Sequence, residues 1–259
     1  MWGAIIGDLA GSIYEYDQVK KVSNILVDEL IVDESFFSDD TILTVAILDA
    51  ILEDKNYENY LRKYGKEYLD YLPDHQPYFK TSFSPGFITW IKGDKPCYSI
   101  GNGAMMRISP VGYLFDTEEG VLNNVYEATI PSHNSRQTID CATTVAMIIF
   151  LARKGYSKEE IMSLLNIQLT FNPFSKFNST CVDTIDNCLY ALFTTDSFES
   201  ALKTVISYGG DTDTNACIVG SMAEALYGID ASLIEKAKEK IPNEFVKKIE
   251  LGYSKITKF

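Results

Sequence analysis

Apolar residues recur with helical spacing over most of the chain, and polar residues that can cap a helix stand before several of the apolar runs. We therefore predict three long apolar helices and four more amphipathic ones. The apolar helices cover 38–53, 135–152 and 212–227, and the amphipathic ones cover 157–166, 180–193, 197–207 and 231–240. The expected N-caps are Ser38, Ser157 and Ser197, and Glu160 would complete a capping box with Ser157.

Two segments interrupt the helical pattern. Residues 25–34 fit either a short hairpin or an irregular surface segment. The stretch from Pro73 to Gly112 is predicted to be a long non-helical segment, and long loops inside compact domains are often functional. Because the chain has neither a linker nor a convincing internal repeat, the pattern predicts an all-α bundle in a single domain that covers residues 1–259.

Composition narrows the class of protein. The chain has 23 Lys and Arg against 36 Asp and Glu, a net charge of −13, which argues against a nucleic-acid partner. No apolar run is long enough to span a membrane, and Asp8 stands where a signal peptide would carry basic residues. A cytoplasmic protein is the simplest expectation.

The cysteines and one of the two histidines carry little functional signal. The five cysteines are odd in number and lack a Cys-x-x-Cys spacing, so we expect reduced, mostly buried thiols rather than disulfides or a zinc site. Cys217 lies inside an apolar helix and is predicted to be a core residue. His75 stands among prolines and is predicted to be a surface loop residue.

The N-terminal segment combines small residues with two acids. Gly3, Gly7 and Gly11 recur every four residues, so they share one helical face and would allow another helix backbone to approach closely. By themselves, Asp8 and Glu15 are more often solvated helix acids or caps than members of a site.

Two acid clusters are more specific. Asp39 and Asp40 stand between Ser38 and Thr41, and a second cluster runs Gly-Gly-Asp-Thr-Asp-Thr over 209–214. The helix dipole alone would explain each acid at roughly 0.3–1 kcal/mol. Because the same arrangement occurs twice, coincidence is a weaker explanation. Carboxylates and neighbouring hydroxyls are hard ligands, and four such carboxylates could hold one or two Mg²⁺ or Mn²⁺ ions.

Two further features are weak evidence for a ligand-binding site when each is taken alone. The turn at 99–103 is rich in glycine, so its backbone N–H groups could approach an anion, although a Gly-Asn-Gly sequence is usually only a turn. His133 precedes the 135–152 helix, and a lone histidine is usually structural. With only four arginines in the chain, loop amides and metal would have to attract a phosphorylated ligand.

Five blocks together resemble the ADP-ribosylglycohydrolase family in their order and spacing. They are GAIIGDLAGSIYE (3–15), SDDT (38–41), GNGAMMRISPVG (101–112), SHNS (132–135) and GGDTDTNACIVGSMAEALYG (209–228). The resemblance implies a compact, single-domain orthogonal helical bundle with a binuclear Mg²⁺ or Mn²⁺ centre in a cleft. It also implies hydrolysis of the bond between C1″ of ADP-ribose and an acceptor, either a protein side chain or a small molecule.

The resemblance further implies roles for individual residues. The metal ligands would be Ser38, Asp39, Asp40, Asp211, Asp213 and Thr214, where Ser38 replaces the family's usual threonine and keeps its hydroxyl. The catalytic residues would be Glu15 and Asp40. The diphosphate would bind Ser99, Gly101, Asn102 and Gly103, and His133 would line the ADP-ribose pocket.

Two other functions stay open at this point. One is a family member that binds ADP-ribose or has a structural role without catalysis, and the intact ligand set weighs against it. The other is a hydrolase of a different nucleotide or glycoside, which nothing in the sequence separates from the first reading. The expected partner is an ADP-ribosylated substrate, with neither nucleic acid nor membrane, and the expected oligomeric state is a monomer.

Overall fold

The computed structural model describes residues 1–15, 25–73, 81–93, 97–172 and 177–256. Within these ranges the regular structure is helical, and sheet-type pairing is confined to isolated bridges between Tyr98 and His133 and between Gly101 and Thr180. The predicted all-α class is confirmed. The helices are α1 (Trp2–Ser12), α3 (Asp39–Leu52), α4 (Tyr57–Glu67), α5 (Pro85–Lys92), α6 (Gly103–Met106), α7 (Ser109–Leu114), α8 (Glu118–Thr129), α9 (Arg136–Arg153), α10 (Lys158–Leu164), α11 (Cys181–Phe193), α12 (Phe198–Ser207), α13 (Thr212–Tyr227), α14 (Ala231–Lys240) and α15 (Asn243–Ser254).

All seven helices named from the sequence are present, with bounds that differ by a few residues at most. The three predicted N-caps are confirmed, because the side chains of Ser38, Ser157 and Ser197 each accept a backbone hydrogen bond from the first turn of their helix. The capping box of α10 is also complete. Residues 25–34 form an irregular segment and not a hairpin.

The predicted non-helical stretch from Pro73 to Gly112 is wrong in part, because it contains α5, α6 and the start of α7. Helices this short contain too few turns to show a hydrophobic period. Two of them also contain a proline, a residue that usually argues against a helix. Pro85 and Pro110 lie in the first turn of α5 and α7, where a missing N–H costs no helical hydrogen bond. His75 lies outside the described residues.

The closest helix pair is α1 and α13. Every residue of α1 is buried. A methyl group added at Gly3, Gly7 or Gly11 would lie only 2.1 or 2.2 Å from a backbone carbonyl oxygen of α13, so only glycine permits this approach. Thr212 Oγ1 donates a hydrogen bond to the Gly11 carbonyl oxygen over 2.8 Å, which ties the start of α13 to the end of α1. The glycine face is confirmed as a packing surface.

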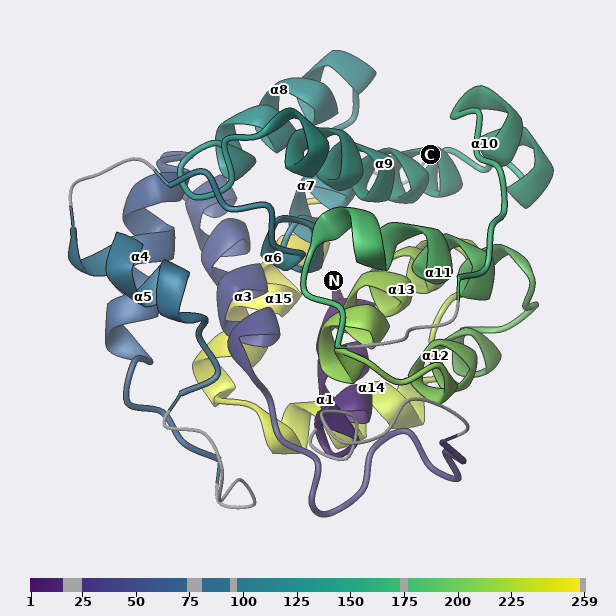
Figure 1. Ribbon diagram of the computed structural model, residues 1–259, viewed down its shortest axis with the longest axis horizontal. Coiled ribbons are helices and arrows are strands. Elements are labelled where there is room, and N and C mark those ends of the chain that lie inside the picture. The colour runs from purple at the N-terminus through teal and green to yellow at the C-terminus, as the bar shows by residue number, and fades with distance from the viewer. Residues whose placement is uncertain (16–24, 74–80, 94–96, 173–176, 257–259) are drawn as a thin grey trace.

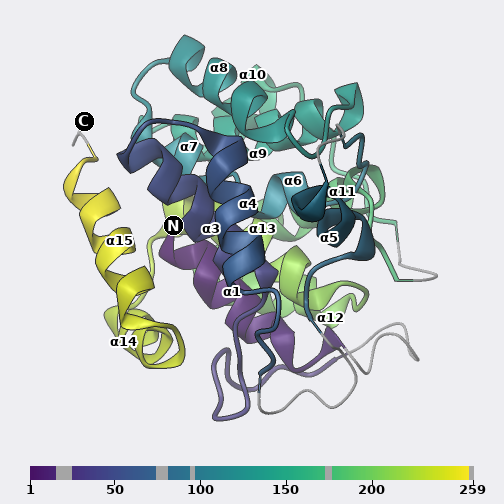
Figure 2. The ribbon, with the colours of Figure 1, turned by 90° about the vertical axis from the view of Figure 1, so that its left-hand side faces the viewer.

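The remaining helices surround this pair and α3. Figure 1 shows α8, α9 and α10 across the top and α4 and α5 at the left. Figure 2 shows α14 and α15 as an outer layer on one side, next to α1 and α3. Helix α3 is buried from Asp40 to Ala50, which explains why its apolar residues occupy nearly every face.

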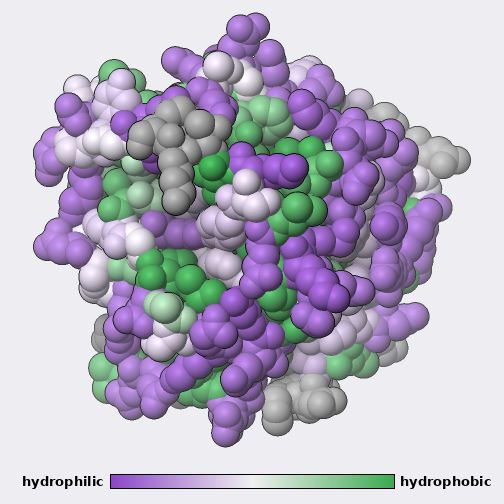
Figure 3. All heavy atoms as spheres, turned by 180° about the vertical axis from the view of Figure 1, so that it is seen from behind, coloured by the Kyte–Doolittle hydropathy of each residue, from purple (hydrophilic) through white to green (hydrophobic). Residues whose placement is uncertain are grey.

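Hydrophilic residues cover most of the face seen in Figure 3, with hydrophobic areas scattered between them. Among the described residues, no helix combines the length and apolar character needed to cross a membrane. The cysteines are all free, as predicted; Cys181, Cys188 and Cys217 are buried, whereas Cys97 and Cys141 are half-buried.

Candidate active site

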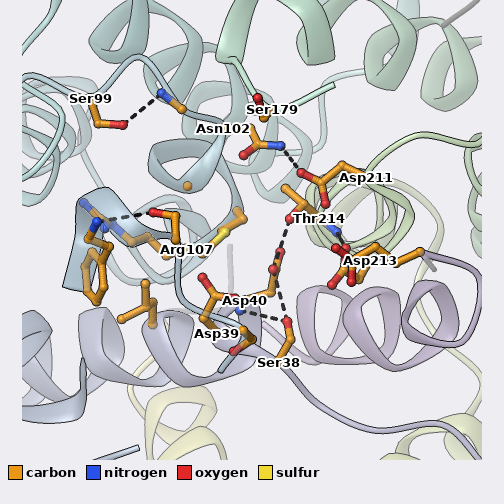
Figure 4. Close-up of a pocket in the computed structure, with 18 of the residues that line it drawn as sticks. Ser38, Asp39, Asp40, Ser99, Asn102, Arg107, Ser179, Asp211, Asp213 and Thr214 are labelled. Atoms are coloured by element: carbon orange, nitrogen blue, oxygen red, sulfur yellow. Dashed lines mark hydrogen bonds between the residues drawn. The ribbon is translucent and has the colours of Figure 1, made fainter. Parts of the chain in front are cut away.

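A cavity of about 220 Å³ lies where the N-terminal ends of α3 and α13 meet the segment that leads into α6 (Figure 4). All twelve residues to which the family resemblance gave a role line this cavity. The other residues that line it are Leu43, Ser82, Ser84, Phe87, Met106, Arg107, Phe177 and Ser179. The cavity therefore collects segments that are far apart in the sequence.

The first acid cluster is held by a carboxylate from another helix. Asp8, on α1, accepts hydrogen bonds from the backbone N–H of Ser38 (2.9 Å) and Thr41 (3.0 Å). It also accepts from their hydroxyls, Ser38 Oγ at 2.9 Å and Thr41 Oγ1 at 2.6 Å. Asp8 is fully buried, so the interpretation of this residue as a solvated helix acid is wrong. It caps the N-terminus of α3 from outside that helix.

The second cluster depends on a turn that only glycine adopts easily. Gly209 and Gly210 have φ angles of 78° and 77°, in the left-handed region. Asp211 directly follows the turn, and its backbone N–H donates a hydrogen bond to Asn178 Oδ1 over 2.9 Å. Asn102 Nδ2 donates to Asp211 Oδ2 over 2.7 Å, so the 99–103 turn is joined directly to the acids.

The two clusters meet inside the cavity. Thr214 Oγ1, on α13, donates to Asp40 Oδ2 on α3 over 3.1 Å, as Figure 4 shows. Carboxylate oxygens of Asp8, Asp40 and Asp213 lie within 4.8 Å of one another, and those of Glu15, Asp211 and Asp213 do the same. Asp213 belongs to both groups. Asp39 lines the cavity but belongs to neither group.

Crowding and burial make these carboxylates hard to ionise together. Burial, followed by the charge of Asp8, raises the pKa of Asp39 to about 7, and burial with the charge of Glu15 does the same for Asp211. The pKa values of Asp40 and Asp213 are raised well above their usual value, by burial and then by the charges of Asp213 and Asp211 respectively.

One carboxylate oxygen of the acid clusters is left without a hydrogen-bond partner in the described part of the chain. Asp40 Oδ1 is buried and has no hydrogen-bond partner among the described residues, a costly arrangement for a polar atom. A site rich in carboxylate and hydroxyl oxygens, with a buried acceptor left over, fits a hard divalent cation. The residues present are therefore suited to hold Mg²⁺ or Mn²⁺.

The glycine-rich turn and His133 form another wall of the cavity. Ser99 Oγ accepts from the Gly101 N–H over 3.1 Å, which braces the turn from within. His133 lies against it, since a methyl group added at Gly103 would be 3.4 Å from His133 Nε2. Burial, and then the charge of Arg107, lowers the pKa of His133 well below its usual value, so this histidine is neutral.

Sequence reasoning gave no role to several residues that the structure places at the site. Both Asp8 and Arg107 stand inside the quoted family blocks, but the local sequence indicates a solvated helix acid at Asp8 and a non-helical segment around Arg107. Asn178 is buried and holds both Asp211 and Asn215 through its side-chain amide, with Asn178 Nδ2 donating to Asn215 Oδ1 over 2.9 Å. No local pattern around Asn178 could have revealed this.

Comparisons with known proteins identify the family and the fold. The family model described as ADP-ribosylglycohydrolase matches residues 1–257. A protein of Acanthamoeba polyphaga mimivirus, provisionally named an ADP-ribosyl glycohydrolase, is 26% identical over 303 aligned positions and covers 93% of this chain and 92% of its own. The ADP-ribosyl-[dinitrogen reductase] glycohydrolase of Rhodospirillum rubrum is 30% identical over 164 residues, which are 58% of this chain and 55% of that protein.

A solved structure shares the fold. It is titled an ADP-ribosylglycohydrolase-related protein complex, with a TM-score of 0.74 at 17% identity, and the match covers 98% of this chain and 95% of the other. An all-α bundle with an acidic cavity between α3 and α13 thus defines the structural class. The chain belongs to the ADP-ribosylglycohydrolase family and is an enzyme of the glycosidase class.

Proposed function

We propose that the chain is a metal-dependent hydrolase that cleaves the ribosyl C1″ bond of ADP-ribosylated acceptors and releases ADP-ribose. The observation that carries this proposal is the convergence of Asp40 from α3 with Asp211 and Asp213 from the start of α13, in one cavity that Glu15 also lines. The names of the relatives support the same reaction class, including an ADP-ribosylarginine hydrolase of Pseudomonas putida that is 23% identical over 178 residues, 62% of this chain and 45% of its own.

The proposed cofactor is a pair of Mg²⁺ ions, with Mn²⁺ as the alternative. The residues that would hold them are Ser38, Asp39, Asp40, Asp211, Asp213 and Thr214. When bound, such ions stabilise developing negative charge and make a water molecule a better nucleophile. The buried, unpartnered Asp40 Oδ1 and the raised pKa values of the acids support a cation here, because burial and the charges of neighbouring acids disfavour ionised Asp40 and a cation would offset both.

The chain's own residues would bind the substrate and move a proton. Breaking the C1″ bond builds oxocarbenium character on the ribose, which nearby carboxylates such as Asp40 stabilise. Glu15 would take a proton from the attacking water when it is an ionised carboxylate, or give one to the leaving group when it is a protonated carboxylic acid. Backbone N–H groups of the 99–103 turn would contact the diphosphate, so a net charge of −13 does not prevent anion binding.

The proposed setting is a cytoplasmic monomer that acts on an ADP-ribosylated protein side chain or small molecule. The five free cysteines support a reducing compartment. A silent ADP-ribose binder of this family is a weaker proposal, because the cavity keeps every carboxylate and hydroxyl of the implied ligand set.

The test measures release of ADP-ribose from Arg-, Ser- and phosphate-linked substrates with Mg²⁺, with Mn²⁺ and with chelator. We expect metal-dependent release from at least one linkage, its loss in Asp213→Asn, and its retention in Asp140→Asn, which changes an exposed acid on α9. Binding of ADP-ribose without release from any substrate would favour the silent binder. Release that is indifferent to chelator would refute the metal-dependent mechanism.

A further inference from the structure

A buried polar chain lies behind the glycine-rich turn. Arg107 follows α6 and is 1% exposed; no carboxylate forms an ion pair with it among the described residues, although the more distant charge of Asp39 favours its charged form. Its Nη2 donates to Ser132 Oγ over 2.7 Å and to the Ala128 carbonyl oxygen over 3.3 Å. Ser132 Oγ in turn lies 2.8 Å from His133 Nδ1. An unpaired buried arginine is costly, so its contact with Ser132 calls for an explanation.

The direction of each hydrogen bond in this chain follows from what each group can donate. A guanidinium only donates, and Arg107 stays protonated at neutral pH, because burial lowers its pKa only to about 10. Ser132 Oγ is therefore the acceptor in its bond with Arg107. The single hydroxyl proton of Ser132 has no other acceptor in the described part of the chain, so it is donated to His133 Nδ1.

The state of the imidazole follows from that donation. Nδ1 accepts the hydrogen bond from the Ser132 hydroxyl through its lone pair and so carries no hydrogen itself. A second positive charge beside Arg107 is unfavourable in a buried site, and burial together with Arg107 keeps His133 neutral. In a neutral imidazole with an unprotonated Nδ1, Nε2 must carry the hydrogen.

The Nε2 atom faces the glycine-rich turn. Methyl groups added at Gly101 and Gly103 would lie 3.6 Å and 3.4 Å from it, and all three residues line the cavity. No protein acceptor for Nε2 is found among the described residues. The glycines therefore leave room for a ligand atom beside a hydrogen-bond donor.

We propose that Arg107 and Ser132 are positioning residues that lock His133 as its neutral Nε2–H tautomer, so that Nε2 donates to an oxygen of the ligand on the 99–103 turn. This inference rests on the proposed function for the identity of the ligand, a nucleoside diphosphate sugar. The tautomer itself does not depend on any ligand. A locked donor needs no rearrangement when an acceptor oxygen arrives, which is the benefit of preorganisation.

The tautomer can be measured directly by ¹⁵N NMR of the imidazole nitrogens. The chain has only two histidines, so the spectrum of His133→Gln assigns the His133 signals by difference. We expect the wild-type protein to show an unprotonated Nδ1 and a protonated Nε2 without ligand or metal. An Nδ1–H tautomer, or a mixture of the two, in the wild-type protein would overturn the inference without any variant.

Variants at Ser132 test the chain of hydrogen bonds from Arg107 through Ser132 to His133, here called the relay. Ser132→Ala should give a tautomer mixture and weaken ADP-ribose binding roughly three- to tenfold, the usual effect of one lost hydrogen bond. Mg²⁺ binding should stay unchanged, as measured by the rise in melting temperature that the metal induces. Ser132→Thr, which keeps the hydroxyl, should restore both properties. Ser221→Ala is the control, since it removes a buried hydroxyl that donates to the Ile218 carbonyl oxygen within α13.

The outcomes separate this inference from the proposed function. An unchanged tautomer in Ser132→Ala would refute the relay, and a changed tautomer with unchanged ADP-ribose affinity would refute its role toward the ligand. A wild-type protein that shows the expected tautomer but binds no ADP-ribose, with or without Mg²⁺, would refute the proposed function and still support the relay. Circular dichroism of each variant shows whether the helical fold is intact.

Discussion

Gly7 offers a sharp test of how α1 and α13 hold the site together. A methyl group at this position would lie 2.1 Å from the Ala216 carbonyl oxygen and 2.3 Å from its carbonyl carbon. Non-bonded carbon atoms settle at about 3.5–4 Å, so Gly7→Ala requires α1 and α13 to separate by roughly 1 Å or more. Both clashing atoms are backbone, so no side-chain rotation relieves the contact.

The size of the effect follows from two opposing contributions. Alanine favours a helix over glycine by up to about 1 kcal/mol. Overpacking costs about 1–3 kcal/mol and more where neighbours cannot move, and both helices here are buried. We therefore expect a net loss of about 2 kcal/mol in the free energy of unfolding, which lowers the melting temperature of a chain this size by roughly 4–8 °C.

Gly86→Ala is the matched control. Gly86 lies in the first turn of α5, and a methyl group there meets nothing within 4 Å. The same substitution should therefore stabilise the protein by up to about 1 kcal/mol and raise the melting temperature slightly. Thermal unfolding monitored by circular dichroism gives both values. If Gly7→Ala is neutral or stabilising like Gly86→Ala, the close α1–α13 packing described above is incorrect.

Four further predictions concern the cavity. Glu15→Gln should fold and bind ADP-ribose but lose about 10²–10⁴-fold in turnover, and wild-type turnover would exclude Glu15 as the proton-transfer group. Asp39→Asn and Asp213→Asn should each abolish Mg²⁺-dependent hydrolysis, with the double variant hardly worse than either single one; additive losses of about 1 kcal/mol in stability alone would indicate mere helix-dipole acids. Gly103→Val should fill the space beside His133 Nε2 and lower ADP-ribose affinity at least about tenfold in calorimetry, while Mg²⁺ still raises the melting temperature; loss of both would make the turn a folding element. The pKa of His133 is depressed in the folded state, so below about pH 6.5 the unfolded chain takes up a proton that the folded chain does not. Between pH 7.5 and 5.5 the free energy of unfolding of the wild type should therefore fall by about 1.4 kcal/mol relative to that of His133→Gln. Parallel profiles of stability against pH for the two proteins would contradict this.

Local sequence determined seven of the described helices and much of the polar chemistry, although α4, α8 and α15 were not predicted. A capping serine followed by an apolar run is sufficient to place α3, α10 and α12, because the cap satisfies backbone N–H groups within the same few residues. The glycine spacing in α1 predicted a close helix contact for an equally local reason. The acid pairs at 39–40 and 211–213 were visible as candidate metal ligands before any fold was known.

Only the tertiary structure decided which of these features act together. Asp8 looks like a helix acid from its neighbours, yet its four hydrogen-bond partners come from Ser38 and Thr41, about thirty residues away. The relay from Arg107 to His133 is equally invisible, because it needs the end of α6 to lie against the loop before α9. Hydrogen bonds and Coulomb interactions depend on distance in space, and a linear pattern records that distance only within one helix turn or one strand.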